Sequence, residues 1–533
     1  MNASAAQPRC IAAARLAVVL ALVLATASTR AFAAFEPPAS ASSGAPAAPP
    51  AVTPAADDTL WPRPAELEKD IEFWRHVYTQ VASDAGLIHD SRQLERVYAT
   101  VRLPANRWSR AADREIDAAK RRYRALLNKL ARDRSGPLDA DETRVLAQFP
   151  ADVSAATLRK AAAQVRFQRG QSDRFREGLR RSGVWLPYIH QQLRARKLPP
   201  ALAVLPHVES SFDASVYSHA GAAGLWQITR ATGRHYLRID HVVDERLDPY
   251  RATEAALKIL AQNHRATGTW PLAITAYNHG PAGLRKAVRK LGTNDIETVL
   301  RNYRSRRFGF ASRNFYVAFL AAGDVVESAA DYFGEFDVAP PAVRRQLTVD
   351  AYIPAAALAE ALAVPLAELK ALNPSLRRMV WEGDKRVPKG FALTLPRAEV
   401  DYAARLGTVP EDARFTEQVR DDAYTVRAGD TLSGIGKRFG LKASHIARVN
   451  NLRSRHRIRV GQVLRLPPAD GGRSGPRQRA PEGSYVVVSG DTLSGIAGRH
   501  GVSESELAGL NRLSNRDRIY PGQILLLAAA EGD

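Results

Sequence analysis

The pattern of hydrophobic and polar residues changes along the chain, and its first feature is a short apolar run. Arg9 and Arg15 precede the run at residues 16–25, and small residues follow it up to Ala33. This three-part pattern is typical of a secretory signal peptide cleaved near Ala33, over residues 1–33. The run is shorter than the roughly 20 residues of a transmembrane helix, so we expect no stable span in the mature chain. An uncleaved membrane anchor is the alternative.

After this run, most apolar positions recur at helical spacing. Residues 34–58 are rich in Ala, Pro and Ser and predict a disordered tether. Residues 59–180 are basic, follow a helical pattern and carry no evident chemical motif, which indicates a scaffold. Residues 181–335 predict an all-helical domain, in which one helix begins at Asp248-Pro249 and another at Pro271.

The C-terminal third contains an internal repeat. Residues 424–466 align with residues 485–527 without gaps, and the segment from Gly429 to Ile435 is identical to that from Gly490 to Ile496. Each copy has β-type residues at its two ends and two helical patterns between them. This order predicts strand–helix–helix–strand modules at residues 422–468 and 484–528, separated by a linker at 469–483. Residues 345–400 resemble a degenerate third copy without the Gly-Asp-Thr-Leu opening.

Composition narrows the possible partners. The formal net charge of +21 indicates an anionic partner. Cleavage near Ala33 would remove three arginines, no acids and Cys10, the one cysteine of the chain. Cys10 precedes the apolar run, which argues against a lipid anchor on it. We expect an exported protein of the periplasm or cell envelope, and export argues against a nucleic-acid partner.

Glu209 is the candidate catalytic residue. It follows the mostly apolar residues 202–208, in which Pro206 should bend or end a short helix. Apolar surroundings raise the pKa of a carboxyl group and let it donate a proton near neutral pH. An ordinary helix-end glutamate is the alternative. His207 is expected to be a hydrogen-bonded helix residue, and the sequence has no metal-binding or phosphate-binding motif, so no metal or cofactor is implied.

Four segments in order resemble the lytic transglycosylases and goose-type lysozymes. They are Val208-Glu209-Ser210-Ser211-Phe212, Ser218 to Gln227 with Gly-Leu-Trp-Gln at its end, Ala276-Tyr277-Asn278-His279-Gly280 and, as a weaker match, Arg313-Asn314-Phe315-Tyr316-Val317. The two repeats resemble lysin motifs, which bind glycans that contain N-acetylglucosamine. Together the resemblance extends from about residue 160 to residue 527.

The resemblance implies an all-α lysozyme-like catalytic domain followed by small α+β lysin-motif modules. Glu209 would be the single catalytic acid/base. The implied substrate-binding residues are Ser218, Gln227, Tyr277, Asn278, Tyr316 and Trp226, with core packing as the alternative for Trp226 and Tyr316. The implied glycan contacts of the modules are Asp430, Thr431, Ile458, Asp491, Thr492 and Ile519.

The expected substrate is peptidoglycan, cut at the MurNAc–GlcNAc β-1,4 bond without water to leave 1,6-anhydro-MurNAc ends. Glycosidases normally use two carboxylates, whereas residues 214–239 contain no acid and Asp213 should cap a turn. A hydrolytic muramidase is the first alternative, in which Asp240 or Asp244 would hold a water. A catalytically silent wall-binding protein is the second.

Overall fold

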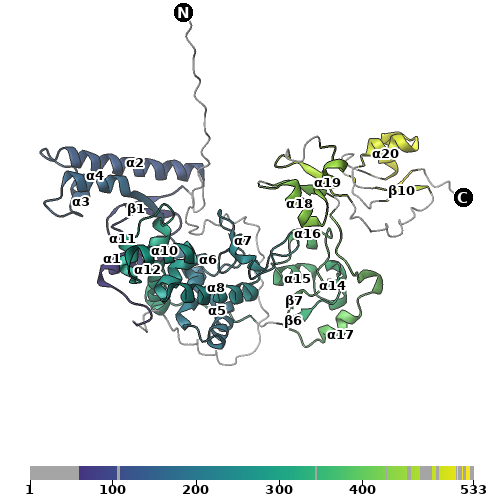
Figure 1. Ribbon diagram of the computed structural model, residues 1–533, viewed down its shortest axis with the longest axis horizontal. Helices are drawn as coiled ribbons and strands as arrows, with labels where there is room; N and C mark the ends of the chain where they lie inside the picture. Colours follow the sequence, from purple (N-terminus) through teal and green to yellow (C-terminus); the bar gives the residue numbers. More distant parts are fainter. Residues whose placement is uncertain are drawn as a thin grey trace, which may run out of the picture. The chain divides into compact units, whose positions relative to one another are not determined.

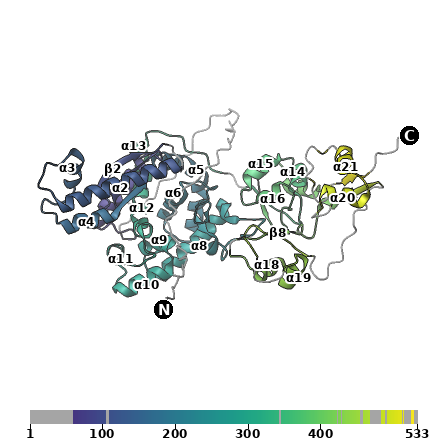
Figure 2. The ribbon, with the colours of Figure 1, turned by 90° about the horizontal axis from the view of Figure 1, so that it is seen from above.

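A computed structural model describes the chain in two compact units, residues 1–417 and 418–533 (Figures 1 and 2). The described residues are 59–104, 109–342, 345–421, 423–427, 429–452, 458–467, 483–487, 491–511, 513, 519 and 524–527. The predicted signal peptide and tether lie outside them, as does nearly all of the predicted linker. Within the described residues, no helix is both long and apolar enough to cross a membrane.

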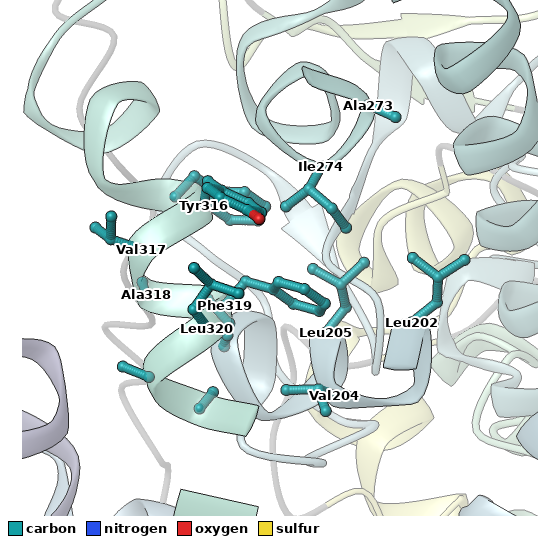
Figure 3. Close-up of a cluster of buried hydrophobic side chains, with 14 of the residues drawn as sticks. Leu202, Val204, Leu205, Ala273, Ile274, Tyr316, Val317, Ala318, Phe319 and Leu320 are labelled. Atoms are coloured by element: carbon teal, nitrogen blue, oxygen red, sulfur yellow. The ribbon is translucent and has the colours of Figure 1, made fainter. Parts of the chain in front are cut away.

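Residues 172–333 are largely helical, as the sequence predicts. Their elements are α5 (Ser172–Ala195), η2 (Pro200–Val204), α6 (Leu205–Ser210), β4 (Ala222–Ala223), β5 (Ile228–Thr229), α7 (Arg230–Gly233), η3 (Glu245–Leu247), α8 (Pro249–Thr267), α9 (Trp270–His279), α10 (Pro281–Leu291), α11 (Ile296–Asn302), α12 (Phe310–Glu327) and α13 (Ala329–Phe333). In their common core, Leu202 and Leu205 meet Ile274 of α9 and Phe319 of α12 (Figure 3).

The helix boundaries follow the predicted signals. The Asp248 carboxylate accepts hydrogen bonds from the backbone N–H of Tyr250 (2.9 Å) and Arg251 (3.1 Å), which caps α8. Gly280, at φ 90°, ends α9. Pro206 lies in the first turn of α6, where a missing N–H leaves no helical hydrogen bond unmade. It therefore separates η2 from α6 and does not distort α6 itself.

The N-terminal region differs from the helical scaffold that the sequence predicts. Strands β1 (Ala85–Asp90), β2 (Val97–Arg102) and β3 (Val165–Arg169) form an antiparallel sheet in the order β2-β1-β3. The long helix α2 (Arg110–Arg132) packs on all three strands and on α4 (Ala155–Gln164), with α3 (Ala140–Leu146) beside it. Five of the six residues of β1 are buried, so the strand lacks the alternation that marks a half-exposed strand.

The boundary predicted at residue 181 is also wrong. Helix α1 (Ala65–Thr79) packs along α12, and its Leu67, Ile71, Trp74 and Tyr78 belong to the same core as α6, α8 and α9. Helix α5 begins nine residues before the predicted boundary, at Ser172. The first helix is therefore an integral part of the helical domain.

Residues 345–417 form a smaller layer of the first unit. Strands β6 (Arg345–Thr348) and β7 (Ala392–Leu395) pair antiparallel and enclose α14 (Ala355–Leu362), α15 (Leu366–Leu372) and α16 (Arg378–Trp381). This order resembles that of the repeats, as predicted, although α17 (Tyr402–Gly407) and η4 (Glu411–Ala413) extend the layer beyond residue 400. Its core takes in Val242 and Val243 of the helical domain.

The second unit contains the two predicted strand–helix–helix–strand modules. The first consists of β8 (Ala423–Thr425), α18 (Leu432–Phe439), α19 (Ala443–Val449) and β9 (Val463–Arg465). The second consists of β10 (Ser484–Val486), α20 (Leu493–His500), α21 (Glu504–Leu510) and β11 (Ile524–Leu526). In each module the two strands pair antiparallel and the module has a hydrophobic core of its own, which confirms the prediction.

Candidate active site

Glu209 lies near the end of α6, directly before a tight turn of the backbone. Ser211 and Phe212 both adopt left-handed conformations, with φ of 50° and 56°. The turn is held by the Ser210 hydroxyl, which donates to the Leu225 carbonyl (2.8 Å), and by the Arg181 guanidinium, which donates to the Ser211 carbonyl (2.8 Å). These bonds fix the end of α6 against α5 and the loop that follows, and so fix Glu209 in position.

The Glu209 side chain is almost withdrawn from water. The residue is only 8% exposed, and no described residue donates a hydrogen bond to its carboxylate. Burial raises the pKa of Glu209 to about 8. A carboxyl group in this state holds its proton at neutral pH and still ionises at a moderate cost, which suits a residue that must donate a proton and later take one.

Two tyrosines from distant parts of the sequence approach Glu209. Burial and the charge of Glu209 raise the pKa of both Tyr78 and Tyr277 above the usual value for a phenol. The buried hydroxyl of Tyr78, on α1, has no hydrogen-bond partner among the described residues. The Tyr277 hydroxyl donates to the Trp226 carbonyl (2.8 Å). Sequence analysis missed Tyr78 because it stands 131 positions before Glu209 in a segment interpreted as scaffold.

The neighbouring histidine does not share the proton chemistry. His207 is buried, its ring stacks on Phe175 at 5.1 Å and meets the edge of Phe212 at 4.5 Å. Burial, with a smaller contribution from Arg181, lowers the pKa of His207 to about 3. Its Nδ1 has no partner in the described part of the chain, so the predicted hydrogen-bonded histidine is an aromatic packing residue. Within the described residues, no cluster of His, Cys, Asp and Glu is suited to a metal ion.

The loop of residues 216–229 presents two predicted binding residues. The Ser218 hydroxyl accepts a hydrogen bond from the Ala222 N–H (3.0 Å). The Gln227 amide donates to the carbonyls of Gly224 (2.9 Å) and Val216 (3.2 Å). The Gln227 Oε1 is buried and no described group donates to it, which leaves an oriented acceptor. Ser218 shapes the loop, whereas Gln227 has an atom left for a ligand.

A buried ion pair anchors the same loop. Arg246 donates to the Gly221 carbonyl (2.7 Å) and pairs with Asp244 (2.9 Å). Asp244 is fully buried and also pairs with Arg377 from the layer of residues 345–417 (3.0 Å). A Cβ at Gly224 would stand 1.8 Å from the Arg246 carbonyl oxygen, so only glycine allows this approach. The layer thus braces the loop that carries Gln227.

Asn278 stands beside Tyr277 at the end of α9 and is exposed. Its Oδ1 accepts a hydrogen bond from the Ser312 hydroxyl of α12 (3.0 Å), and Ser312 also lies 3.2 Å from His279 Nδ1. The side-chain amide of Asn278 is therefore oriented by α12, with its N–H₂ group available to a ligand. Ser312 is a second residue that sequence analysis did not single out.

Trp226 and Tyr316 do not occupy the predicted binding positions. Trp226 is fully buried and its Nε1 donates to the Thr253 hydroxyl (2.9 Å). A ring without exposed area cannot stack on a sugar, so Trp226 is a core residue. Tyr316 is also fully buried within the cluster of Figure 3, and its hydroxyl donates to the Pro62 carbonyl (2.9 Å). The core-packing alternative holds for both.

The three acids that the sequence offers as a second carboxylate are engaged elsewhere. The Asp213 carboxylate accepts from the Ser215 N–H (2.9 Å) and hydroxyl (2.6 Å), as its predicted role in a turn requires. Asp240 accepts from the N–H groups of Val242 and Val243, both at 2.7 Å. Asp244 is the buried partner of two arginines. None of the three is placed as a free second carboxylate for Glu209.

The predicted glycan contacts of the modules have clear internal roles. Asp430 accepts from the Tyr424 hydroxyl (2.7 Å), and Asp491 does the same with Tyr485 (2.8 Å). Thr431 and Thr492 cap α18 and α20, each accepting a backbone N–H at 3.0 Å. Ile458 and Ile519 pack against the two module cores. These residues shape the loops, and their contact with glycan stays a prediction.

The comparisons with known families fit this architecture. Residues 187–300 match the Transglycosylase SLT domain, and residues 424–467 and 485–528 match the LysM domain. The chain is therefore a lytic transglycosylase with a lysozyme-like SLT domain and two LysM domains. The SLT match contains Glu209, Gln227, Tyr277 and Asn278.

Among individual proteins, the chain is similar to membrane-bound lytic murein transglycosylase D of Escherichia coli K12. The identity is 29% over 360 residues, which is 65% of this chain and 76% of the relative. N-acetylmuramoyl-L-alanine amidase sle1 of Staphylococcus saprophyticus is 40% identical over 106 residues, 19% of this chain and 32% of that one. The solved structure of an inactive mutant of lytic transglycosylase Slt from Pseudomonas aeruginosa is 18% identical, covers 42% of this chain and 33% of that chain, and has a TM-score of 0.25.

The raised pKa of Glu209 predicts how activity depends on pH. Because the first proton transfer needs the protonated carboxyl group, we expect kcat/KM to fall about tenfold per pH unit above a pKa near 8. Near pH 8, His207 is already deprotonated and Tyr78 and Tyr277 are still protonated. None of the three residues therefore adds a second change of slope to the profile. A profile from about pH 3.5 to about pH 10 checks this result. An alkaline limb near pH 4.5 would show that Glu209 is not buried in solution.

Proposed function

We propose that the enzyme cuts the glycan strands of peptidoglycan at the MurNAc–GlcNAc β-1,4 bond without water, leaving 1,6-anhydro-MurNAc ends. In the first step Glu209 donates its proton to the glycosidic oxygen as the bond to the anomeric carbon breaks. In the second step the ionised Glu209 takes the proton of the C6 hydroxyl of the same MurNAc, and that oxygen bonds to the anomeric carbon. Glu209 ends the cycle protonated, as it began.

The observation that carries this proposal is the isolation of Glu209. Hydrolysis with inversion of configuration needs a second carboxylate to activate water. Hydrolysis with retention of configuration needs a second carboxylate as the nucleophile. Asp213, Asp240 and Asp244 are each held by other groups, and no described residue bonds to the Glu209 carboxylate. An internal hydroxyl nucleophile needs no second acid, because its effective concentration replaces the positioning of a water.

The neutral polar groups around Glu209 suit an acetamido sugar. The unpartnered Gln227 Oε1 can accept the acetamido N–H, and the exposed Asn278 amide can donate to a sugar hydroxyl or carbonyl. Tyr277 and Tyr78 supply phenols next to Glu209. The LysM domains would hold the enzyme on N-acetylglucosamine residues of the same polymer. We accordingly propose an exported enzyme that works on the wall in the periplasm or cell envelope.

The chemistry of the new ends tests this proposal. An anhydro end has no free anomeric hydroxyl, so borohydride cannot reduce it, whereas an end made by hydrolysis is reducible. We expect purified sacculi digested by the enzyme to give muropeptides whose new MurNAc ends resist reduction. Reducible new ends would identify a hydrolytic muramidase. Sacculi that remain uncut in a zymogram would identify a wall-binding protein without activity.

A further inference from the structure

Two adjoining cavities lie on the N-terminal side of the helical domain, apart from the residues around Glu209. Their volumes are about 750 Å³ and about 740 Å³, and they share Ser91, Arg92, Gln164 and Arg313. Seven lysines and arginines and four carboxylates line the first cavity, and five basic and two acidic side chains line the second. Both cavities therefore carry an excess of positive charge.

Three of the six acids that line these cavities already have partners. Asp70 pairs with Arg301 (2.8 Å), and Asp117 pairs with Lys120 (2.8 Å). The Asp90 carboxylate accepts from the N–H groups of Arg92 (2.7 Å) and Gln93 (3.2 Å), which holds the turn after β1. These acids therefore offset the charge of some basic side chains of the cavities and leave other basic side chains without an ion pair among the described residues.

Three of the basic side chains left over line the first cavity together: Arg92, Arg304 and Arg313. Within the described part of the chain none of the three forms an ion pair with a carboxylate. They are close enough to repel one another, because burial and then the charges of Arg92 and Arg304 lower the pKa of Arg313 to about 10. Arg313 is held in place by a hydrogen bond to the Ser91 carbonyl (3.2 Å). The carboxylates of Asp70 and Asp90 offset these charges only in part. Like charges kept together and only partly neutralised form a site that an anion would stabilise.

Arg166 adds a second, independent observation that points to an anion site. Its guanidinium lies over the Phe310 ring, 4.2 Å from the centroid, and it lines the second cavity with Arg92 and Arg313. The Arg166 Nε is buried and has no hydrogen-bond acceptor among the residues that the structure describes. A buried N–H without an acceptor costs free energy that a bound carboxylate or phosphate oxygen would recover.

The arginine group stands within reach of the catalytic residues. Arg313 directly follows Ser312, which orients Asn278. On α1, Asp70 of the first cavity lies eight residues before Tyr78, about 12 Å along the helix at 1.5 Å per residue. A peptide of three to five residues spans up to roughly 10–18 Å. A stem peptide on a MurNAc close to Glu209 can therefore reach the cavity.

We propose that Arg92, Arg304 and Arg313, with Arg166 behind them, bind the carboxylates of the peptide stem of peptidoglycan. The inference rests on the proposed function, because it assumes a glycan strand next to Glu209. The arginines would act as specificity residues that favour strands with charged stems. They take no part in the proton transfers.

Two soluble substrates test this inference with the full-length enzyme: glycan oligomers that carry stems and the same oligomers after an amidase has removed them. We expect the double variant Arg92→Ala/Arg304→Ala to raise KM at least about fivefold for stem-bearing oligomers, with kcat and the stem-free reaction unchanged, since charge-assisted bonds to carboxylates are lost. The matched control Arg285→Ala/Arg289→Ala removes two exposed arginines of α10 and should change neither reaction.

Each other outcome decides against the inference. Equal use of both substrates by the parent enzyme, or an equal loss on both substrates in the double variant, would overturn stem recognition. Inorganic phosphate serves as a further probe: if it binds the parent but not the double variant while stems have no effect, the site serves free phosphate. Failure of the parent to cut either substrate would instead count against the proposed function.

Discussion

Replacement of Glu209 by Gln is expected to lower kcat by about 10²–10⁴-fold or more. General acid catalysis alone supplies a rate gain in that range. One residue serves both proton transfers, and the other acids in its vicinity are bound to backbone groups or arginines. The variant Asp213→Asn is the matched control: it changes a neighbouring acid that only caps a turn and should keep turnover within a few-fold of the parent. Single-turnover assays on soluble glycan measure both variants.

Stability separates a loss of chemistry from a loss of fold in this experiment. The folded-state pKa of Glu209, about 8, lies above the usual 4.5, so its favourable contribution is complete below pH 4.5 and is lost as pH rises toward 8. At pH 7 the neutral Gln avoids this loss, and we expect Glu209→Gln to unfold at the same or a higher denaturant concentration than the parent. A folded variant that keeps more than a tenth of the parent's turnover would contradict the role of Glu209.

Removal of residues 418–533 is expected to weaken binding to insoluble sacculi by about 10²–10⁴-fold, the gain that two linked weak binding modules provide on one polymer. The remaining chain keeps the whole first compact unit, including the Tyr352–Phe415 backbone pairing, and should still cut soluble glycan. Sedimentation with sacculi measures the binding.

High salt provides the control for this second prediction. The basic first unit would also adhere to an acidic wall by charge, and salt screens that attraction while it leaves close sugar contacts largely intact. In high salt, we therefore expect the full chain to pellet with sacculi and the shortened chain to remain in solution. Equal pelleting of the two chains would show that the LysM domains do not hold the enzyme on the wall.

The features that the sequence predicted correctly depend on local signals. Asp248-Pro249 and Gly280 act through the nearest turn of helix, so the bounds of α8 and α9 follow from a few residues. The modules were recognisable because an exact repeat shows one pattern twice. Likewise, the apolar residues before Glu209 predicted its burial correctly, because η2 and α6 place Leu202, Leu205 and Val208 in one core.

The features that the sequence did not predict depend on tertiary packing. Tyr78 meets Glu209 only because α1 packs along α12, and no local pattern encodes that contact. Trp226 matched a binding motif, yet the turn that carries Gln227 directs the indole toward Thr253. The buried strand β1 has no alternation of polar and apolar residues, so its sequence could not be told from a helix.

The central claim, that one buried carboxyl group cleaves the strand without water, is tested most directly by digestion in water enriched in oxygen-18. Mass spectrometry of the released muropeptides then shows the source of the oxygen at each new MurNAc end. The account predicts new ends that carry no label and are lighter by one water than the hydrolysed form. New ends that contain oxygen-18 and the mass of one added water would contradict it.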